Sequence, residues 1–398
     1  MKTVGVDRWL LVAVAVLCGF GLIMVFSSSD ALGAIQWHNP AYYFERQLLW
    51  MALGLVLALA ALGLDYHRLR ELAVPAALFT LFLLVVVLVP HVGVSVNGAR
   101  RWIGIGQFTF QPAELAKVVG IIYLARWLDK SGERLRTVRG GLVPFLLMVG
   151  LLVGLVLLEK DLGTSIVLGL IAISMYVVAG ARWRHIGALA GVSATVLLLM
   201  IKLEPYRASR IGTFFNPWAD ALNTGFQSVQ SVIALGSGGL FGVGLGQSVQ
   251  KYQWLPQAHT DFIFAIVGEE LGLMGTMFVL ALFCVVAWRG YRAALRSPDR
   301  FGLLVATGIT SWITFQAFVN IAAVTVTLPT TGIPLPFISF GGSSLTITLG
   351  AVGLLLNISA QGVKPVLSRR ASLDIGRRHR RPHLSRAGGG ARAYSART

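Results

Sequence analysis

Ten apolar runs, each near the length that crosses a lipid bilayer, dominate the 398-residue chain. A transmembrane helix needs about 20 mostly apolar residues. Charged residues make up 13% of the sequence, against about 25% in soluble domains, so the chain cannot cover a water-facing surface. We therefore expect an all-α polytopic membrane protein with about ten transmembrane helices, formed by residues 9–26, 47–64, 72–90, 114–128, 142–158, 163–180, 185–202, 262–288, 301–324 and 336–361.

The distribution of basic residues predicts the orientation. An even number of spans puts both termini on one side, and that side holds 25 of the 34 lysines and arginines but 7 of the 17 acidic residues. Because cytoplasmic connections are enriched in Lys and Arg, we expect both termini in the cytoplasm. The net charge of +17 then reflects orientation and a basic tail, which removes the case for a nucleic-acid partner.

The same reasoning divides the chain into three parts. Residues 1–8 form a short cytoplasmic N-terminus, and 9–361 form one transmembrane domain. Residues 362–398 are rich in Arg and contain too few apolar residues to build a core, so we expect a disordered cytoplasmic tail. We expect this tail to be solvated, with attraction to anionic lipid head groups as a weaker addition.

The segments expected outside the membrane carry the unusual residues. Segments 91–113, 203–261 and 325–344 are long and rich in Gly, Pro and aromatic residues, and long ordered loops are usually functional. In the largest, 203–261, apolar residues at helical spacing from Phe226 predict a short interfacial or re-entrant helix. The glycines that follow it favour either tight packing on the bundle or a backbone lining for a substrate head group. Neither a strand nor a βαβ unit supports a nucleotide site there.

Asp261 stands where that loop meets the next span. Thr260 is a plausible N-cap for the following helix, which would place Asp261 in its first turn. A carboxylate there serves either to balance the helix dipole or to accept a proton from a substrate hydroxyl at the membrane boundary. Glu269 and Glu270 lie deeper in the same run, where ionisable groups are costly and suggest function.

A second group of candidates lies in and after segment 91–113. Arg100 and Arg101 directly precede Trp102 on the side where basic residues are rare, so an anionic lipid phosphate is a natural partner. Glu114 and Lys117 are i,i+3 neighbours on one predicted helix. A local ion pair and a role at the substrate site both remain open for them.

Long stretches of the sequence resemble the SEDS family of bacterial shape, elongation, division and sporulation proteins. The resemblance is carried by 97–117, by 236–275 with His259-Thr260-Asp261-Phe262, and by 334–344. It covers nearly all of 9–361, and it is closest to the division branch, with the elongation and sporulation branches as alternatives. It implies a peptidoglycan glycosyltransferase in the bacterial cytoplasmic membrane at the division septum, which polymerises lipid II on the outer face. The implied partners are a class B penicillin-binding transpeptidase and other divisome membrane proteins.

The resemblance also implies roles for individual residues. The family's essential acid matches Asp261, and its functionally sensitive tryptophan, glutamate and lysine match Trp102, Glu114 and Lys117. Asp161 belongs to a family motif, although this chain has Lys160 where the family usually has proline.

Glycan polymerisation requires a base for the acceptor hydroxyl, for which Asp261 is the candidate. The departing pyrophosphate requires positive charge, which Arg100, Arg101, Lys117 or Lys251 would supply. No cofactor is required, although a divalent cation such as Mg²⁺ would suit a pyrophosphate. The alternatives from other classes are a lipid II flippase and a scaffold that only recruits the transpeptidase.

Overall fold

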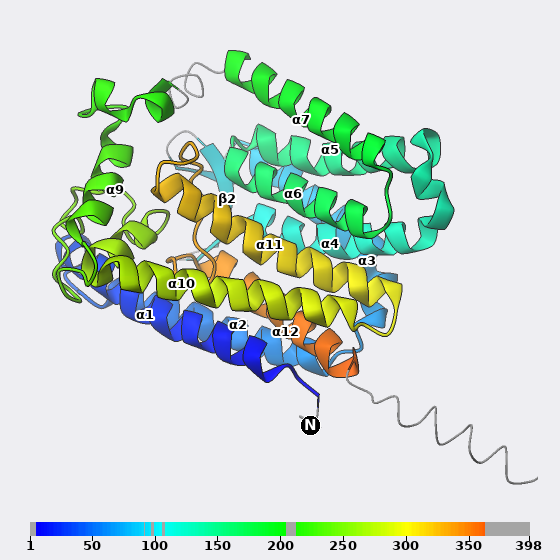
Figure 1. The fold of residues 1–398 in the computed structure, drawn as a ribbon, viewed down its shortest axis with the longest axis horizontal. Helices are drawn as coiled ribbons and strands as arrows, with labels where there is room; N and C mark the ends of the chain where they lie inside the picture. The colour runs from blue at the N-terminus through cyan, green and yellow to red at the C-terminus, as the bar shows by residue number, and fades with distance from the viewer. Residues whose placement is uncertain (1–4, 91, 97–98, 106–107, 204–211, 363–398) are drawn as a thin grey trace, which may run out of the picture. The chain divides into compact units, whose positions relative to one another are not determined.

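The computed structural model describes residues 5–90, 92–96, 99–105, 108–203 and 212–362. The expected disordered tail lies outside the described residues almost entirely. Each of the ten apolar runs falls on a helix, as predicted (Figure 1). These helices are α1 (Arg8–Trp37), α2 (Tyr42–Gly63), α3 (His67–Leu88), α4 (Pro112–Ser131), α5 (Val143–Leu158), α6 (Leu162–Val178), α7 (Trp183–Leu203), α10 (Ile263–Leu295), α11 (Arg300–Val324) and α12 (Gly342–Gly362).

Among the described residues, seven helical segments are long and apolar enough to cross a membrane. They are α1, α2, α3, α5 together with the preceding π-helical turn, α10, α11 and α12, while α6 is a shorter apolar helix. The protein is thus a multi-pass helical membrane protein, and the count of ten spans stays a prediction. Shorter elements are η1 (Gly132–Arg136), η2 (Val138–Leu142), η3 (Pro217–Asp220) and α9 (Phe226–Ser237).

Two predicted helix starts are wrong. The last run was expected to form a helix from residue 336, but α12 begins at Gly342, since Pro334 and Pro336 keep the preceding segment out of a helix. Thr260 does not cap α10, because that helix begins at Ile263 after Phe262, which makes no side-chain capping bond. Asp261 therefore lies in the turn before the helix.

Helices α11 and α12 form the buried centre of the bundle. Helix α11 packs against α4, α6 and α10, and α12 packs mainly on α2. The α2–α12 contact depends on small residues, which let helix backbones approach closely in a membrane. A Cβ built on Gly353 would lie 2.3 Å from the carbonyl oxygen of Ala58, so a larger residue cannot replace this glycine without separating the helices. The outer faces of α2 and α3 expose leucine, valine and phenylalanine side chains, as expected for lipid contact.

A small antiparallel sheet precedes α4, and sequence reasoning missed it. Its order is β1-β2-β3, with β1 (Gly93–Val96), β2 (Ala99–Ile105) and β3 (Phe108–Phe110). Asn-Gly between short runs is the strongest local signal for a hairpin, and Asn97-Gly98 separates β1 from β2 in the sequence. The sheet packs against α3 and α4 through β2.

The glycine-rich loop after α9 packs into a break in α10. Gly272 has a φ of 64° and interrupts the helix. On one side of the break, the backbone N–H groups of Val243 and Gly244 donate to the carbonyls of Glu269 and Glu270, both at 3.0 Å. A Cβ on Gly242 would lie 2.1 Å from the Glu270 carbonyl oxygen, so only glycine allows this approach. The packing interpretation of these glycines is confirmed.

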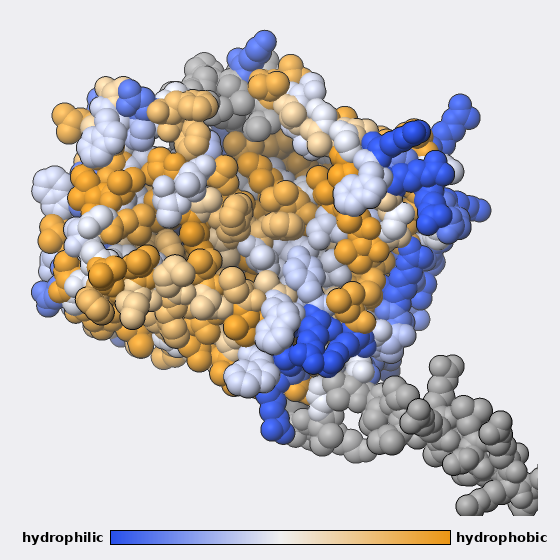
Figure 2. Space-filling model, in the orientation of Figure 1, coloured by the Kyte–Doolittle hydropathy of each residue, from blue (hydrophilic) through white to orange (hydrophobic). Residues whose placement is uncertain are grey.

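Charged residues gather at one end of the helices. Figure 2 shows apolar side chains over most of the visible face and hydrophilic side chains at the end that carries the α4–α5, α6–α7 and α10–α11 connections. Helix α9 and the glycine-rich loop lie at the opposite end (Figure 1). This segregation supports the predicted orientation, with the basic end in the cytoplasm.

A cysteine at Val249 should therefore react with an impermeant thiol reagent from outside intact spheroplasts. Val249 is 60% exposed, whereas its neighbour Ser248 is buried and bonded to Glu269, so Val249 is the better reporter. The exposed Cys284 is replaced by serine in this background. Labelling of Val249→Cys only after permeabilisation would reverse the orientation.

Candidate active site at the outer end of the bundle

Gln316 on α11 connects the predicted Glu114–Lys117 pair to the segment before α12. Its Oε1 accepts hydrogen bonds from Lys117 Nζ at 2.8 Å and from Trp312 Nε1 at 2.7 Å. Its Nε2 donates to the Pro334 carbonyl at 2.9 Å. Both the oxygen and the nitrogen of the Gln316 amide are therefore hydrogen-bonded, and the side chain links α4 to the residues around Pro334.

Asn320, one helical turn further along α11, holds the turn that carries Asp261. Its Nδ2 donates to the backbone carbonyls of Asp261 at 2.7 Å and Ile333 at 2.8 Å. Asn320 Oδ1 is buried and has no hydrogen-bond partner among the described residues. Since Gln316 and Asn320 lie on one face of α11, this helix brings α4, the Asp261 turn and the segment before α12 together.

The uncharged segment 331–341 lies directly against the Asp261 turn. Phe340 N donates to the His259 carbonyl at 2.9 Å, and Ser339 Oγ donates to the Thr260 carbonyl at 2.5 Å. A Cβ built on Gly332 would lie 3.6 Å from Asp261 Oδ2. The Asp261 carboxylate therefore lies beside the backbone of Gly332, which places no side chain of its own against it.

His259 contributes an aromatic contact to the same turn and was not predicted as a functional residue. Its ring lies 4.7 Å from that of Tyr43 and 5.8 Å from that of Phe340. Burial lowers the pKa of the imidazole to about 4. The ring is therefore neutral near pH 7 and cannot supply positive charge to a leaving group.

Glu114 and Lys117 form the predicted local ion pair, and it is buried. Lys117 Nζ lies 2.8 Å from Glu114 Oε1, and both side chains are 2% exposed. The same ammonium lies 4.7 Å from the centre of the Trp312 ring, a favourable cation–π arrangement. Glu114 Oε2 is buried without a hydrogen-bond partner among the described residues. Such a pair requires both partners, because either charge alone would be buried without compensation.

The two arginines of β2 differ in their surroundings. Arg101 donates from Nη2 to the Lys160 carbonyl at 2.6 Å and from Nε to the Glu159 carbonyl at 3.4 Å, which ties the sheet to the α5–α6 turn. Arg100 is exposed. Trp102 is half-buried on β2, which packs against α4. Contact of Arg100, Arg101 and Trp102 with substrate stays a prediction.

Asp161 caps α6, and its carboxylate already has three donors from the protein. Oδ1 accepts from Thr164 N at 3.0 Å, while Oδ2 accepts from Thr164 Oγ1 at 2.9 Å and from Gln111 Nε2 at 3.1 Å. Gln111, missed by sequence reasoning, also donates its backbone N–H to Ser343 Oγ at 3.3 Å. These bonds give Asp161 a capping role, and direct contact with substrate stays a prediction.

Glu159 is an unexpected buried carboxyl beside this cap. It is 1% exposed, and neither of its oxygens has a hydrogen-bond partner among the described residues. Burial and the nearby charge of Asp161 raise the pKa of Glu159 to about 9, against the opposing effect of Arg101. The carboxyl group is therefore protonated near pH 7.

The pKa of Glu159 predicts a pH-dependent stability. Glu159 of the unfolded chain loses its proton above the ordinary pKa of 4.5, whereas the folded protein retains this proton up to about pH 9. The contribution of Glu159 to the free energy of unfolding therefore falls as the pH rises toward 9. Glutamine does not titrate. The melting temperature of Glu159→Gln relative to the parent should therefore rise steadily from about pH 5 to pH 8, and a difference that is constant with pH would show that Glu159 is ionised throughout.

Lys251 and the acids of α10 hold the glycine-rich loop. Lys251 is buried and forms an ion pair with Asp30 of α1, with Nζ 3.0 Å from Oδ2. Glu269 accepts from Ser248 Oγ and from the backbone N–H of Val249, and Glu270 accepts from Ser27 Oγ of α1. Both glutamates therefore bond to neighbouring segments. Binding of the pyrophosphate by Lys251 stays a prediction. The described residues contain no cluster of three candidate metal ligands, and binding of a divalent cation also stays a prediction.

Comparison with known proteins places this chain in a family. Residues 8–364 match the family model described as "Cell cycle protein", which joins FtsW, RodA and SpoVE. The probable peptidoglycan glycosyltransferase FtsW of Geobacter metallireducens is 44% identical over 88% of this chain and 94% of its own length. Stage V sporulation protein E of Bacillus subtilis is 43% identical over 90% of this chain and 98% of its own.

Solved structures agree with this assignment. A chain of a peptidoglycan synthase complex that coordinates polymerisation and crosslinking is 33% identical, with a TM-score of 0.73 over 90% of this chain and 99% of that one. The rod shape determining protein RodA of Thermus thermophilus is 30% identical, with a TM-score of 0.69 over 92% of this chain and 100% of that one. The extent of these matches, from α1 to the end of α12, shows that the chain belongs to the SEDS family, as its sequence motifs predicted.

Proposed function

We propose that this protein is a peptidoglycan glycosyltransferase that polymerises lipid II into glycan strands during septal wall synthesis. Relatives 40–44% identical over most of the chain are named as probable enzymes of this kind. The observation that carries the proposal is the position of Asp261, whose turn is held by Asn320 and whose carboxylate lies beside the Gly332 backbone. A carboxylate placed there suits the activation of a substrate hydroxyl.

The reaction transfers a sugar between two lipid-linked substrates. Asp261 accepts the proton of the acceptor GlcNAc 4-hydroxyl, and the oxygen attacks C1 of the donor MurNAc. The bond from C1 to undecaprenyl pyrophosphate breaks, and the pyrophosphate leaves with the electron pair. Arg100 is the exposed candidate for stabilising this charge, because Arg101, Lys117 and Lys251 already have protein partners.

The family also suggests a partner and a location. A relative of known structure belongs to a peptidoglycan synthase complex that both polymerises and crosslinks. We infer that this protein works with a class B penicillin-binding transpeptidase, which crosslinks the new strands, and with other divisome proteins at the division septum. Because the chain also matches a sporulation protein and RodA, the sporulation and elongation branches of the family are the alternatives. Co-localisation of the protein with the division septum would test them.

Purified full-length protein given fluorescent lipid II in detergent tests the activity. Glycan strands that a muramidase digests would support the proposal. A folded protein, alone and with its transpeptidase, that makes no strands would contradict it. Lipid II transfer across the bilayer of proteoliposomes, without polymerisation, would favour a flippase, and neither activity would favour a scaffold.

A further inference from the structure

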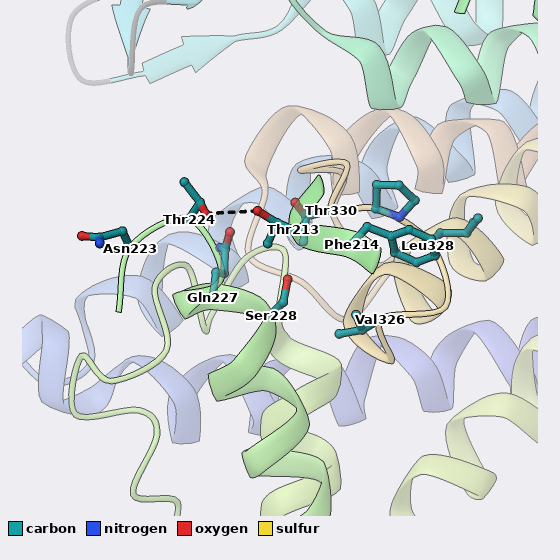
Figure 3. Close-up of a pocket in the computed structure, with 10 residues that line it drawn as sticks. Thr213, Phe214, Asn223, Thr224, Gln227, Ser228, Val326, Leu328 and Thr330 are labelled. Carbon is teal, nitrogen blue, oxygen red and sulfur yellow. Dashed lines mark hydrogen bonds between the residues drawn. The ribbon is translucent and has the colours of Figure 1, made fainter. Parts of the chain in front are cut away.

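A hollow of ≈ 200 Å³ has no role in the chemistry proposed above. It lies between residues 213–228 of the large external loop and residues 326–330 after α11 (Figure 3). Thr330, which lines it, is two residues from Gly332, and Gly332 lies against Asp261 Oδ2. The hollow thus adjoins the segment that faces the Asp261 carboxylate.

The described lining of the hollow combines uncharged polar side chains with apolar ones. None of the described residues that line it is ionisable, while Phe214, Val326, Leu328 and Pro329 add an aromatic ring and aliphatic groups. Hydroxyls and amides recognise neutral hydroxyl and amide groups, whereas a phosphate favours a cation, and the described part of the lining contains none. The polar lining residues are Thr213, Asn223, Thr224, Gln227, Ser228 and Thr330.

Hydrogen bonds fix several of these side chains in advance. Asp220, outside the lining, accepts from Asn223 Nδ2 at 2.8 Å, from Thr224 N at 3.1 Å and from Thr224 Oγ1 at 2.9 Å. These bonds lower the pKa of Asp220, so the acceptor stays ionised. Thr213 Oγ1 donates to Thr224 Oγ1 at 3.1 Å, as the dashed line in Figure 3 shows.

Gln227 links the hollow to the chain that leads to Asp261. Its Nε2 donates to the Pro256 carbonyl at 3.3 Å, five residues before the carboxylate. It projects from the first turn of α9, a regular helix, so its position is set by a rigid element. A ligand group bound by Gln227 would therefore be held at a defined place relative to the Asp261 turn.

We propose that this hollow is a saccharide subsite, which binds a neutral N-acetylated sugar of the glycan strand while an adjacent sugar reacts at Asp261. Sugar hydroxyls and acetamido groups match the hydroxyls and amides of the lining. The C–H face of a pyranose matches Phe214 and Leu328. This inference rests on the proposed glycosyltransferase function and names the part of the substrate that this surface takes.

Binding of chitotetraose, a neutral GlcNAc oligomer without lipid, peptide or phosphate, tests the subsite directly. Full-length protein in detergent is titrated by calorimetry in its parent form and as Asn223→Ala, Gln227→Ala and Gln230→Ala. Gln230 lies on the same helix but does not line the hollow, so it is the matched control. We expect each lining variant to weaken binding about five- to tenfold, as for the loss of one hydrogen bond, and the control to bind as the parent does. Asn223 is exposed, so its substitution should leave folding intact.

The same variants separate this inference from the proposed function. Shorter glycan strands from the lining variants than from Gln230→Ala would support a subsite for the growing strand. Equal chitotetraose affinity in all four proteins, no binding by the parent, or displacement of the sugar by inorganic pyrophosphate would overturn the subsite. A parent protein that binds chitotetraose through these residues but does not polymerise lipid II would overturn the proposed function alone.

Discussion

Replacing Lys117 with methionine is expected to destabilise the protein by about 3–5 kcal/mol, the range measured when one partner of a buried ion pair is removed. Methionine fills a similar volume but leaves the Glu114 carboxylate buried at 2% exposure without its ammonium partner. Gln316 Oε1 also loses one of its two donors. The measurement is the free energy of unfolding of the detergent-solubilised protein, followed by denaturant titration.

A double variant separates charge from packing. Glu114→Gln together with Lys117→Met removes both charges, and uncharged replacements of a whole buried pair are often nearly neutral. We expect most of the lost stability to return in this protein. A single Lys117→Met protein within about 1 kcal/mol of the parent would contradict the buried pair, since that loss is typical of ordinary substitutions.

The helices could be predicted because a membrane leaves the chain few options. Backbone groups inside a bilayer must be satisfied within the segment, so a long apolar run becomes a helix. Each predicted run accordingly falls on a helix, from α1 to α12. The break at Gly272 could not be predicted, because the backbone groups freed there are satisfied by a loop some thirty residues earlier in the chain.

Only the charged residues of the candidate site could be predicted from the sequence. Charged residues in an apolar chain are conspicuous, so Asp261, Glu114 and Lys117 could be named as candidates from the sequence, and their roles at the site stay predictions. Gln316 and Asn320 are uncharged and lie within an apolar run, yet they connect these residues. Gln316 and Asn320 are one helical turn apart, and this spacing indicates in the sequence that both lie on the same face of α11. The partners of Asp161 and Lys251 depend on contacts between distant segments, which no local pattern encodes.

Asp261→Asn should lower polymerisation by about 10²–10⁴-fold, the usual contribution of general-base catalysis. Asparagine keeps the size of the side chain but cannot accept the proton. Asn320 bonds to the backbone carbonyl of residue 261, so the turn should keep its position in the variant. The alternative role in capping α10 is weakened by the structure, because Phe262 occupies the cap and makes no side-chain bond.

The rate of lipid II polymerisation by purified Asp261→Asn protein, compared with the parent at equal concentration and equal lipid II binding, tests the central claim most directly. Asn320→Ala is the matched control for displacement of the turn, because it removes the bond to the residue 261 backbone and keeps the carboxylate. We expect Asp261→Asn to lose at least about a hundredfold in rate with melting temperature and lipid II affinity unchanged. Glycan strands made within a few-fold of the parent rate would contradict the assignment of Asp261 as the base.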